Sequence, residues 1–303
     1  MPAAKGFPAS SVVFRMQAGL VIFLFFAFLG ATVYGDTEFL LHTRRIRDTP
    51  QQVDPEVESL LRSSFYAADP TVVSLPRWQG NSSSPELQAV VAAQLDQHAS
   101  NVISVDLADA SDEAEVLEKV SKMVILLNKN FDVPLEDILL VGFAEGAHLA
   151  GGVAAKVHAD LGHKPLHLTA LDPTSGESLQ HVLSPSDAEF VEVVHTDSGG
   201  EGTWETLGHV DYFPNGGTSQ PGCSEGSCSH ERAFELLAEM WSPANDFVSA
   251  VCGSVETMSA QNCRWSSLKM GQRGEERPTS GIYFLETRQS SPFGRGAYHI
   301  SFL

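Results

Sequence analysis

Three positions, in a fixed chain order, have the spacing of a site for nucleophilic catalysis. An apolar run leads into Gly142-Phe143-Ala144-Glu145-Gly146, after which come Asp172 and His230. In a nucleophile elbow, two flanking glycines let a strained central residue point its side chain out above a sheet, and the acid and the histidine follow later in the chain. Taken singly, the glycines could merely let a helix pack on a strand, Asp172 could cap a helix or turn, and His230 could open a helix. The order of the three favours a catalytic arrangement.

The central position of this arrangement lacks the atom that the chemistry needs. Acyl transfer requires a hydroxyl whose proton a histidine can accept, together with a pocket of hydrogen-bond donors for the oxyanion intermediate. Ala144 carries only a methyl group, and no placement of Asp172 and His230 supplies the missing oxygen. We therefore predict an elbow whose shape is kept and whose ester chemistry is lost.

Short β-branched runs alternate along the chain with longer segments of helical spacing. One such segment is 112–130, and another follows the turn at Gly146. Strands that alternate with helices predict a mostly parallel central sheet covered by helices on both faces. Together with the chain order of elbow, Asp172 and His230, this predicts an α/β-hydrolase fold. No repeat or low-complexity linker interrupts the pattern, so residues 36–303 are expected to form a single domain. The predicted strands are 72–75, 102–107, 138–143, 166–171, 190–195 and 282–286.

The N-terminal segment has the features of a secretion signal. Arg15 precedes an almost uninterrupted apolar run over residues 18–31, and a small residue follows at Gly35. This pattern predicts a signal peptide over residues 1–35 and a secreted, extracellular mature protein. Because the run is shorter than the roughly 20 residues that span a bilayer, no stable membrane anchor is expected. An uncut signal-anchor is the alternative.

Charge and cysteine content narrow the range of partners. The formal net charge is −19, so nucleic acid and anionic membrane surfaces, which need basic patches, are not expected to bind. In an oxidising compartment the four cysteines predict two disulfides; three connectivities are possible, and the sequence-local one is preferred. A zinc site through Cys223, Cys228 and His230 fits such a chain poorly, so neither a metal nor a cofactor is expected. The preferred pairs are Cys223–Cys228 and Cys252–Cys263.

Several further stretches carry a resemblance to a known family. The most specific is the end of segment 208–217, which reads Pro-Asn-Gly-Gly. With these stretches the chain resembles the pancreatic-lipase superfamily, in particular its short insect-type members and the lipase-related yolk proteins of flies. The resemblance covers essentially the whole chain from Asp36 onward. The other matching stretches are 141–151, 168–173, 186–190, 194–197, 221–223, 228–230 and 281–286.

This resemblance implies a role for each position of the candidate site. It places the nucleophilic serine of the family on Ala144, the acid on Asp172 and the histidine on His230. The backbone N–H groups of Trp78 and Glu145 would then be the two donors to the oxyanion. The resemblance thus implies a complete hydrolase site from which the nucleophile is missing.

Other residues of this site also depart from the family pattern. The oxyanion strand of the family ends in His-Gly-Trp, whereas this chain has Pro76-Arg77-Trp78, and arginine restricts a backbone that glycine leaves free. A carboxylate at Glu145 would lie unfavourably beside a developing oxyanion. Of the acidic residues that hold calcium in the family only Asp187 is kept, so no metal site is expected.

Together these observations predict a secreted lipase-like protein that is catalytically inactive. A groove for a lipid or another apolar ligand is expected to remain, in a carrier, storage or yolk-protein-like role, and Asn81 is a candidate glycosylation site. The alternative is an active carboxylester hydrolase of the triacylglycerol lipase or phospholipase A1 type, acting in lipid catabolism with Ser74 or Ser178 as a substitute nucleophile. A protein-interaction module on the same fold is a third possibility, and the sequence indicates no particular protein partner.

Overall fold

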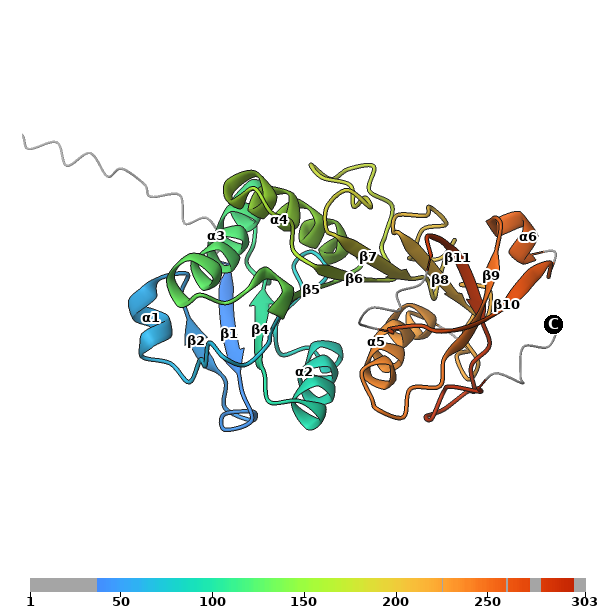
Figure 1. Cartoon of the computed structure of the whole chain (residues 1–303), viewed down its shortest axis with the longest axis horizontal. Helices are drawn as coiled ribbons and strands as arrows, with labels where there is room; N and C mark the ends of the chain where they lie inside the picture. The colour runs from blue at the N-terminus through green and yellow to red at the C-terminus, as the bar shows by residue number, and fades with distance from the viewer. Residues whose placement is uncertain (1–36, 225, 260, 273–278, 297–303) are drawn as a thin grey trace, which may run out of the picture. The chain divides into compact units, whose positions relative to one another are not determined.

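The core of the protein is one β-sheet, seen in a computed structural model that describes residues 37–224, 226–259, 261–272 and 279–296 (Figure 1). These residues belong to a compact unit that begins at Tyr34, and the predicted signal peptide lies outside the described residues. Within them the sheet has eleven strands, in the order β10-β9-β11-β8-β7-β6-β5-β3-β4-β1-β2. The strands are β1 (Glu38–His42), β2 (Gln51–Val53), β3 (Thr71–Leu75), β4 (Asn101–Asp106), β5 (Ile138–Phe143), β6 (His167–Leu171), β7 (Phe190–Val194), β8 (Val210–Pro214), β9 (Val248–Cys252), β10 (Cys263–Lys269) and β11 (Gly281–Leu285).

The middle of the sheet is parallel, and its two edges are antiparallel. Strands β11, β8, β7, β6, β5, β3 and β4 are paired in parallel throughout. Strands β1 and β2 add antiparallel beside β4, and β9 and β10 add antiparallel beside β11. Because the carboxyl ends of parallel strands meet at one edge, the residues that follow β5 and β6 come together there.

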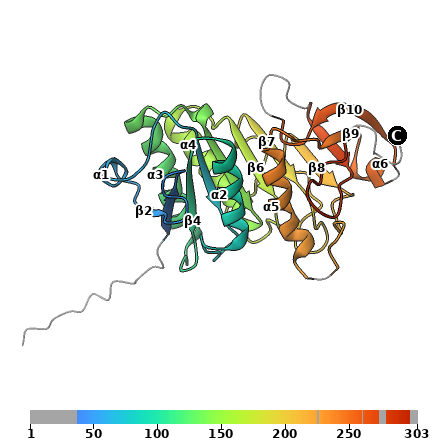
Figure 2. The ribbon, with the colours of Figure 1, turned by 90° about the horizontal axis from the view of Figure 1, so that it is seen from below.

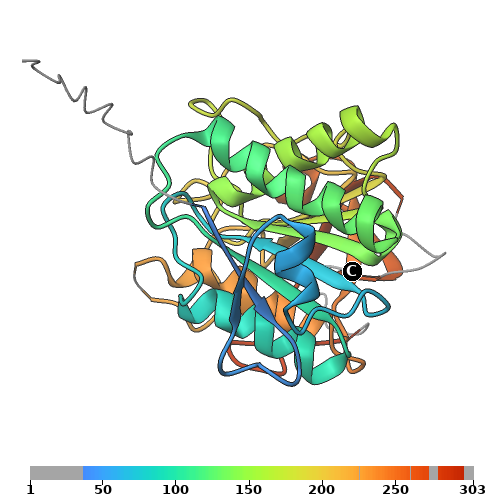
Figure 3. The ribbon, with the colours of Figure 1, turned by 90° about the vertical axis from the view of Figure 1, so that its left-hand side faces the viewer.

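Helices cover both faces of the sheet. The end-on view of Figure 3 shows α3 (Glu113–Phe131) and α4 (Glu145–Leu161) on one face, with α2 (Pro85–Gln97) and α5 (Cys228–Met240) on the other. In Figure 2 α2 and α5 lie side by side in front of the strands. Within the described ranges no helix has both the length and the apolar content that crossing a lipid bilayer demands. The short helices are α1 (Val57–Leu61), α6 (Val255–Ser259) and the 3-10 turn η1 (Leu135–Asp137).

Strand β5 shows how the sequence divides its side chains between the two layers. Ile138 and Leu140 are buried under α3 and α4, in one apolar core. Leu139, Val141 and Phe143 point the other way and join a second core that includes residues of α2 and α5. This alternation follows from the two-residue period of a strand, and a strand buried on both faces is apolar at every position. The second core therefore places the Phe143 ring on the α5 side, next to the candidate site.

The predicted α/β architecture is confirmed, and the predicted elements agree closely with the observed ones. All six predicted strands are present, with ends that differ by one residue at most. The predicted helix 112–130 is Glu113–Phe131, because the Asp112 carboxylate accepts the backbone N–H of Ala114 at 2.9 Å and caps the helix from outside. Helix α2 was not predicted, although Ser84 caps it and Pro85 opens it.

Both predicted disulfides are confirmed. Cys223 is bonded to Cys228, which opens α5, and Cys252 of β9 is bonded to Cys263 of β10. The first bond closes the short loop that leads into α5, and the second joins the two antiparallel strands at the edge of the sheet. Disulfides form and persist in oxidising compartments, so their presence fits a protein of the extracellular space.

Candidate functional site

The site is built around the tight turn that joins β5 to α4. Ala144 separates the strand from the helix, with φ 55° and ψ −120°, a conformation that residues with a Cβ rarely adopt. A Cβ at Gly142 would lie 2.2 Å from the carbonyl oxygen of Gly146, and one at Gly146 would lie 2.1 Å from that of Pro76. Both glycines are therefore required by close backbone approach, as a nucleophile elbow demands.

The strained backbone at Ala144 persists although the side chain has no reactive atom. Conformations of this kind cost on the order of 1–3 kcal/mol and are held by the surrounding structure. Here the N–H of Ala144 donates to the carbonyl oxygen of Leu171 at 3.1 Å, and the Ala144 carbonyl accepts from Ala147. The elbow is therefore kept in shape, with a methyl group where the nucleophile would stand.

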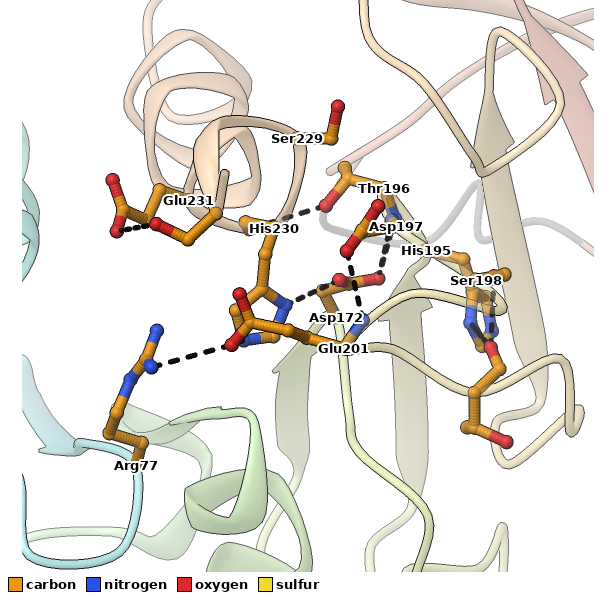
Figure 4. Close-up of polar contacts among 12 residues, drawn as sticks. Arg77, Asp172, His195, Thr196, Asp197, Ser198, Glu201, Ser229, His230 and Glu231 are labelled. Carbon is orange, nitrogen blue, oxygen red and sulfur yellow. Dashed lines mark hydrogen bonds and ion pairs between the residues drawn. The ribbon is translucent and has the colours of Figure 1, made fainter. Parts of the chain in front are cut away.

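Asp172 and His230 form a buried hydrogen-bonded pair beside the elbow (Figure 4). His230 Nδ1 donates to Asp172 Oδ2 at 2.6 Å, and both side chains are fully buried. The other carboxylate oxygen of Asp172 accepts the backbone N–H groups of Thr196 and Asp197, at 2.7 and 3.0 Å. Asp172 directly follows β6, and His230 lies in the first turn of α5. The sheet and one helix terminus thus hold the acid and the histidine that the sequence singled out.

The His230 ring lies directly beside the elbow. Its centroid is 4.3 Å from that of Phe143, the residue before Ala144. The Nε2 atom, which would face a nucleophile, is buried and has no hydrogen-bond partner among the described residues. The structure therefore brings Asp172 and His230 together beside Phe143, the residue before Ala144, and no hydroxyl of a described residue pairs with His230 Nε2.

A carboxylate lies against one of the two backbone donors that were expected to form an oxyanion site. The N–H of Trp78 donates to Oε2 of Glu145 at 3.3 Å, so one of the two expected donors is already taken by a side chain of the protein. A negative charge at that position repels the oxyanion that the site would have to stabilise. The glutamate therefore both occupies the donor and opposes the charge of the intermediate.

A pair of charged side chains covers the histidine, in a contact that no sequence motif indicated (Figure 4). Glu201 Oε2 lies 3.9 Å from His230 Nε2 and 3.5 Å from Arg77 Nη1. The Arg77 guanidinium also lies over the Phe143 ring, 5.1 Å from its centroid. Glu201 belongs to the turn 197–202, where its N–H donates to Asp197 Oδ2 at 2.9 Å. The only sequence feature that marks this contact is the position of Glu201 between two glycines.

The remaining candidate residues lie apart from this cluster. Ser74 is buried in β3, and its hydroxyl has no partner among the described residues; Ser178 is exposed in a loop. Neither forms a hydrogen bond with His230. Asn81 is exposed, as an acceptor of a glycan must be. Asp187 accepts from His181 Nε2 at 2.9 Å, and across the described residues no group of three or more His, Cys, Asp or Glu side chains could hold a metal ion.

The parallel sheet, the elbow after β5, the acid after β6 and the histidine of α5 define the protein as an α/β-hydrolase. Comparison with known proteins gives the family. The sequence model described as Lipase matches residues 31–293, and the chain belongs to that family.

The individual relatives are similar to this chain at low sequence identity. The chain is 27% identical to human pancreatic lipase-related protein 3 and 26% identical to rabbit (Oryctolagus cuniculus) pancreatic triacylglycerol lipase, over 88% of this chain and 66% of each relative. It thus spans just under two thirds of these curated relatives. Lipase member H-B of Xenopus laevis is 33% identical over 57% of this chain and 42% of that protein. Among solved structures, a hormone-sensitive lipase from a metagenome library has a TM-score of 0.30 and 20% identity, over 36% of this chain and 37% of that one.

Two histidines hold the loop after Asp172 and need opposite protonation states. His148 accepts the N–H of Leu183 on Nδ1 and donates to a backbone carbonyl from Nε2, so its ring is neutral, and burial lowers its pKa. His181 donates to Asp187, and that hydrogen bond raises the pKa of His181.

These pKa shifts predict a stability optimum near the unperturbed histidine pKa of about 6.5. The stability due to neutral His148 is lost as the pH falls below that value, and the stability due to charged His181 is lost as the pH rises above it. We expect His181→Gln to flatten the alkaline decline in melting temperature and to leave the acid decline in place. The exposed His163, changed to Gln, is the control, and an unchanged alkaline decline in His181→Gln would contradict this assignment.

Proposed function

We propose that the protein is a pseudoenzyme of the Lipase family, secreted and unable to hydrolyse esters, that binds a lipid or another apolar ligand. The observation that carries this proposal is the elbow itself, which holds Ala144 in a nucleophile conformation without a nucleophile. The lipase names of the relatives support an ancestral site of ester chemistry. The Asp172–His230 pair can still hold a proton acceptor in place, but no attacking atom lies before it.

Two further contacts support the loss of hydrolysis. The Glu145 carboxylate occupies the Trp78 donor, and losing one oxyanion donor costs about 10²–10³ in rate in a working hydrolase. The Glu201 carboxylate lies 3.9 Å from His230 Nε2. In an enzyme this nitrogen would exchange a proton with the nucleophile and the leaving group. Each contact by itself opposes catalysis, so restoring one atom would not restore the reaction.

The ligand-binding part of the proposal depends on access to this buried cluster. Ala144 and His230 are at most 1% exposed, and Glu201, which pairs with Arg77, lies 3.9 Å from His230 Nε2. We propose that an apolar chain enters where Arg77 and Glu201 separate, and that it then lies against Phe143. Extraction of the purified secreted protein, followed by mass spectrometry, tests this step. Recovery of a lipid in stoichiometric amount supports a carrier or storage role; lipid-free protein contradicts it and leaves the loss of hydrolysis standing.

A fluorophosphonate probe tests the loss of hydrolysis directly. Because the probe needs an activated serine, we expect no labelling of the unmodified protein under conditions that label an active lipase fully. Short-chain esters should be turned over no faster than by a His230→Ala variant. Labelling that depends on His230 would instead support the alternative, an active carboxylester hydrolase in lipid catabolism, and the labelled residue would show whether Ser74 or Ser178 is the nucleophile.

The secreted form offers a separate prediction. We expect the mature protein to begin near Asp36 with both disulfides formed, because a short apolar run ends in a small residue at Gly35. The intact mass of the secreted product, before and after removal of N-linked glycans, measures the start of the chain, the disulfides and the occupancy of Asn81 together. A mass that includes residues 1–35 would contradict cleavage. An unchanged mass after glycan removal would show that Asn81 carries no N-linked glycan.

A further inference from the structure

A separate cavity lies at the end of the parallel strands opposite to the elbow. It has a volume of about 390 Å³ and is lined by the residues after β1, by the loop before β3 and by the residues before β4. Strands β3, β4 and β5 are parallel, with Thr71 beside both Asn101 and Ile138 at their starts. The elbow follows the end of β5, so the cavity and the elbow lie at opposite ends of these strands.

The wall of this cavity is fixed by a buried asparagine. The Oδ1 atom of Asn101 accepts the N–H of Tyr66 at 3.1 Å, and its amide nitrogen donates to the carbonyl oxygens of Tyr66 and Asp69 at 3.0 and 3.1 Å. Next to Tyr66, the Phe65 ring packs edge-on against Phe131 with centroids 5.5 Å apart. The loop therefore holds its shape before a ligand arrives, which lowers the entropy cost of binding.

The charge of this cavity is opposite to that of the whole chain. Two arginines and one aspartate line it, whereas the chain has a net charge of −19. The Arg44 side chain is held in place, because its Nε donates to the carbonyl oxygen of Leu95 at 2.8 Å. The Arg45 guanidinium has no hydrogen bond or ion pair with any described residue. Among the described residues, Arg45 is thus an unpaired cation that lines a cavity whose other arginine is already fixed.

Two buried hydroxyl groups in the same wall lack hydrogen-bond partners in the described part of the chain. Thr43 is 8% exposed and Ser100 is 2% exposed, and neither side-chain oxygen forms a hydrogen bond with a described residue. A buried hydroxyl without a partner costs on the order of 1–3 kcal/mol. Both residues line the cavity, but their hydroxyl oxygens are buried, so a χ1 rotation must turn them toward an acceptor that binds there. Hydroxyl donors together with a guanidinium are a donor set that suits the oxygens of a tetrahedral oxyanion.

Two aromatic residues form another part of the wall, beside Ser63, Ser64, Asp69 and Ala99. Tyr66 is 62% exposed and lines the cavity beside Phe65, so an apolar ring is available in the same cavity as the cation. We infer that this cavity binds a phosphate monoester, with the anion between Arg45 and the hydroxyls of Thr43 and Ser100 and the organic part against Tyr66. The site is independent of the former hydrolase site, and it takes either a soluble ester or the phosphate headgroup of a lipid.

Calorimetric titration with phenyl phosphate, compared with phenol, tests the anion requirement on the full secreted protein. We expect phenyl phosphate to bind and phenol to bind far more weakly, and added salt should reduce the affinity. Arg45→Gln should weaken binding by about ten-fold or more, since it removes a charge-assisted contact. Arg264→Gln, at an exposed arginine of β10, is the matched control and should bind as the unmodified protein does.

The hydroxyl groups permit a test in which binding and stability change in opposite directions. Thr43→Val and Ser100→Ala each remove an unpartnered buried hydroxyl, so both should bind phenyl phosphate more weakly and yet unfold at equal or higher urea concentration. A merely structural role for these residues would lower stability and leave binding unchanged, which would contradict the assignment.

Vesicles distinguish the two sources of the phosphate. Flotation with phosphatidylcholine vesicles that do or do not contain phosphatidic acid shows whether a lipid headgroup is taken. Binding to phosphatidic acid that depends on Arg45 assigns the site to a membrane lipid, and binding of phenyl phosphate alone assigns it to a soluble ester. Failure of both probes to bind in an Arg45-dependent way, or equal binding of phenol and phenyl phosphate, would overturn the inference.

Discussion

Ala144→Ser by itself is expected to leave the protein without measurable esterase activity, whereas Ala144→Ser combined with Glu145→Leu, Pro76→His and Arg77→Gly should recover it. The serine supplies the missing oxygen beside His230, but the single variant still has the Glu145 carboxylate on the N–H of Trp78. Removing that carboxylate frees the donor and takes away a charge that repels the oxyanion. One such donor is worth about 10²–10³ in rate, so the gap between the single and the combined variants should be at least of that order.

Two glutamate variants separate occupancy from charge at this position. In the Ala144→Ser background, Glu145→Gln removes the charge and keeps an acceptor for the Trp78 N–H, whereas Glu145→Leu removes both. We expect Glu145→Leu to give the larger gain in the rate of fluorophosphonate labelling. Adding His230→Ala to the combined variant should abolish labelling, because the serine then has no base. Full labelling of Ala144→Ser alone would show that the Glu145 contact does not obstruct the oxyanion site.

Much of the fold could be predicted from the sequence, because strands buried on both faces leave uninterrupted apolar runs. Strand β5 is such a run, and its predicted bounds equal the observed ones. Strand β8 was missed because Asp211 interrupts it. That carboxylate is buried and accepts from His195 Nε2 at 3.0 Å and from the N–H of Leu207 at 2.9 Å. His195 is distant from Asp211 in the sequence and Leu207 is close to it. The hydrophobic periodicity of the sequence indicates neither hydrogen bond.

The edge strands were missed for a different reason. Strand β10 is half exposed along most of its length, so its polar and apolar residues follow no clear pattern. Strands β1 and β2 are short, and they are placed by pairing with each other and with β4 rather than by their own propensity.

The identity of the site residues was accessible to sequence reasoning, but their mutual contacts were not. The elbow, Asp172 and His230 could be proposed from chain order because the fold fixes where the strands end. The contact of Glu201 with His230 depends instead on how the turn 197–202 folds back over the acid, where a Cβ at Gly202 would lie 2.6 Å from Asp172 Oδ1. The direction of the Glu145 side chain likewise follows from the position of Trp78 in three dimensions.

Asp172→Ala is expected to lower the free energy of unfolding by about 3 kcal/mol or more, even in a protein that, as proposed, hydrolyses no ester. The carboxylate accepts three hydrogen bonds, from His230 Nδ1 and from the backbone N–H groups of Thr196 and Asp197. An alanine would leave all three donors buried without partners. Asp172→Asn should cost less, about 1–2 kcal/mol, because its amide oxygen can still accept both backbone N–H groups.

Urea unfolding with the disulfides intact measures these differences, and Glu201→Gln is the matched control, because that carboxylate is 43% exposed and its ion pairs should be worth about 1 kcal/mol or less. The expected difference gives a physical reason why a hydrolase site that lost its nucleophile, as proposed here, would keep its acid and its histidine. A methyl group at Ala144 leaves no buried polar atom of its own unsatisfied, whereas any apolar residue at position 172 strands several donors inside the protein. If Asp172→Ala unfolded at the same urea concentration as Glu201→Gln, the Asp172–His230 pair would have no structural role, and its persistence beside Ala144 would point to a retained chemical function.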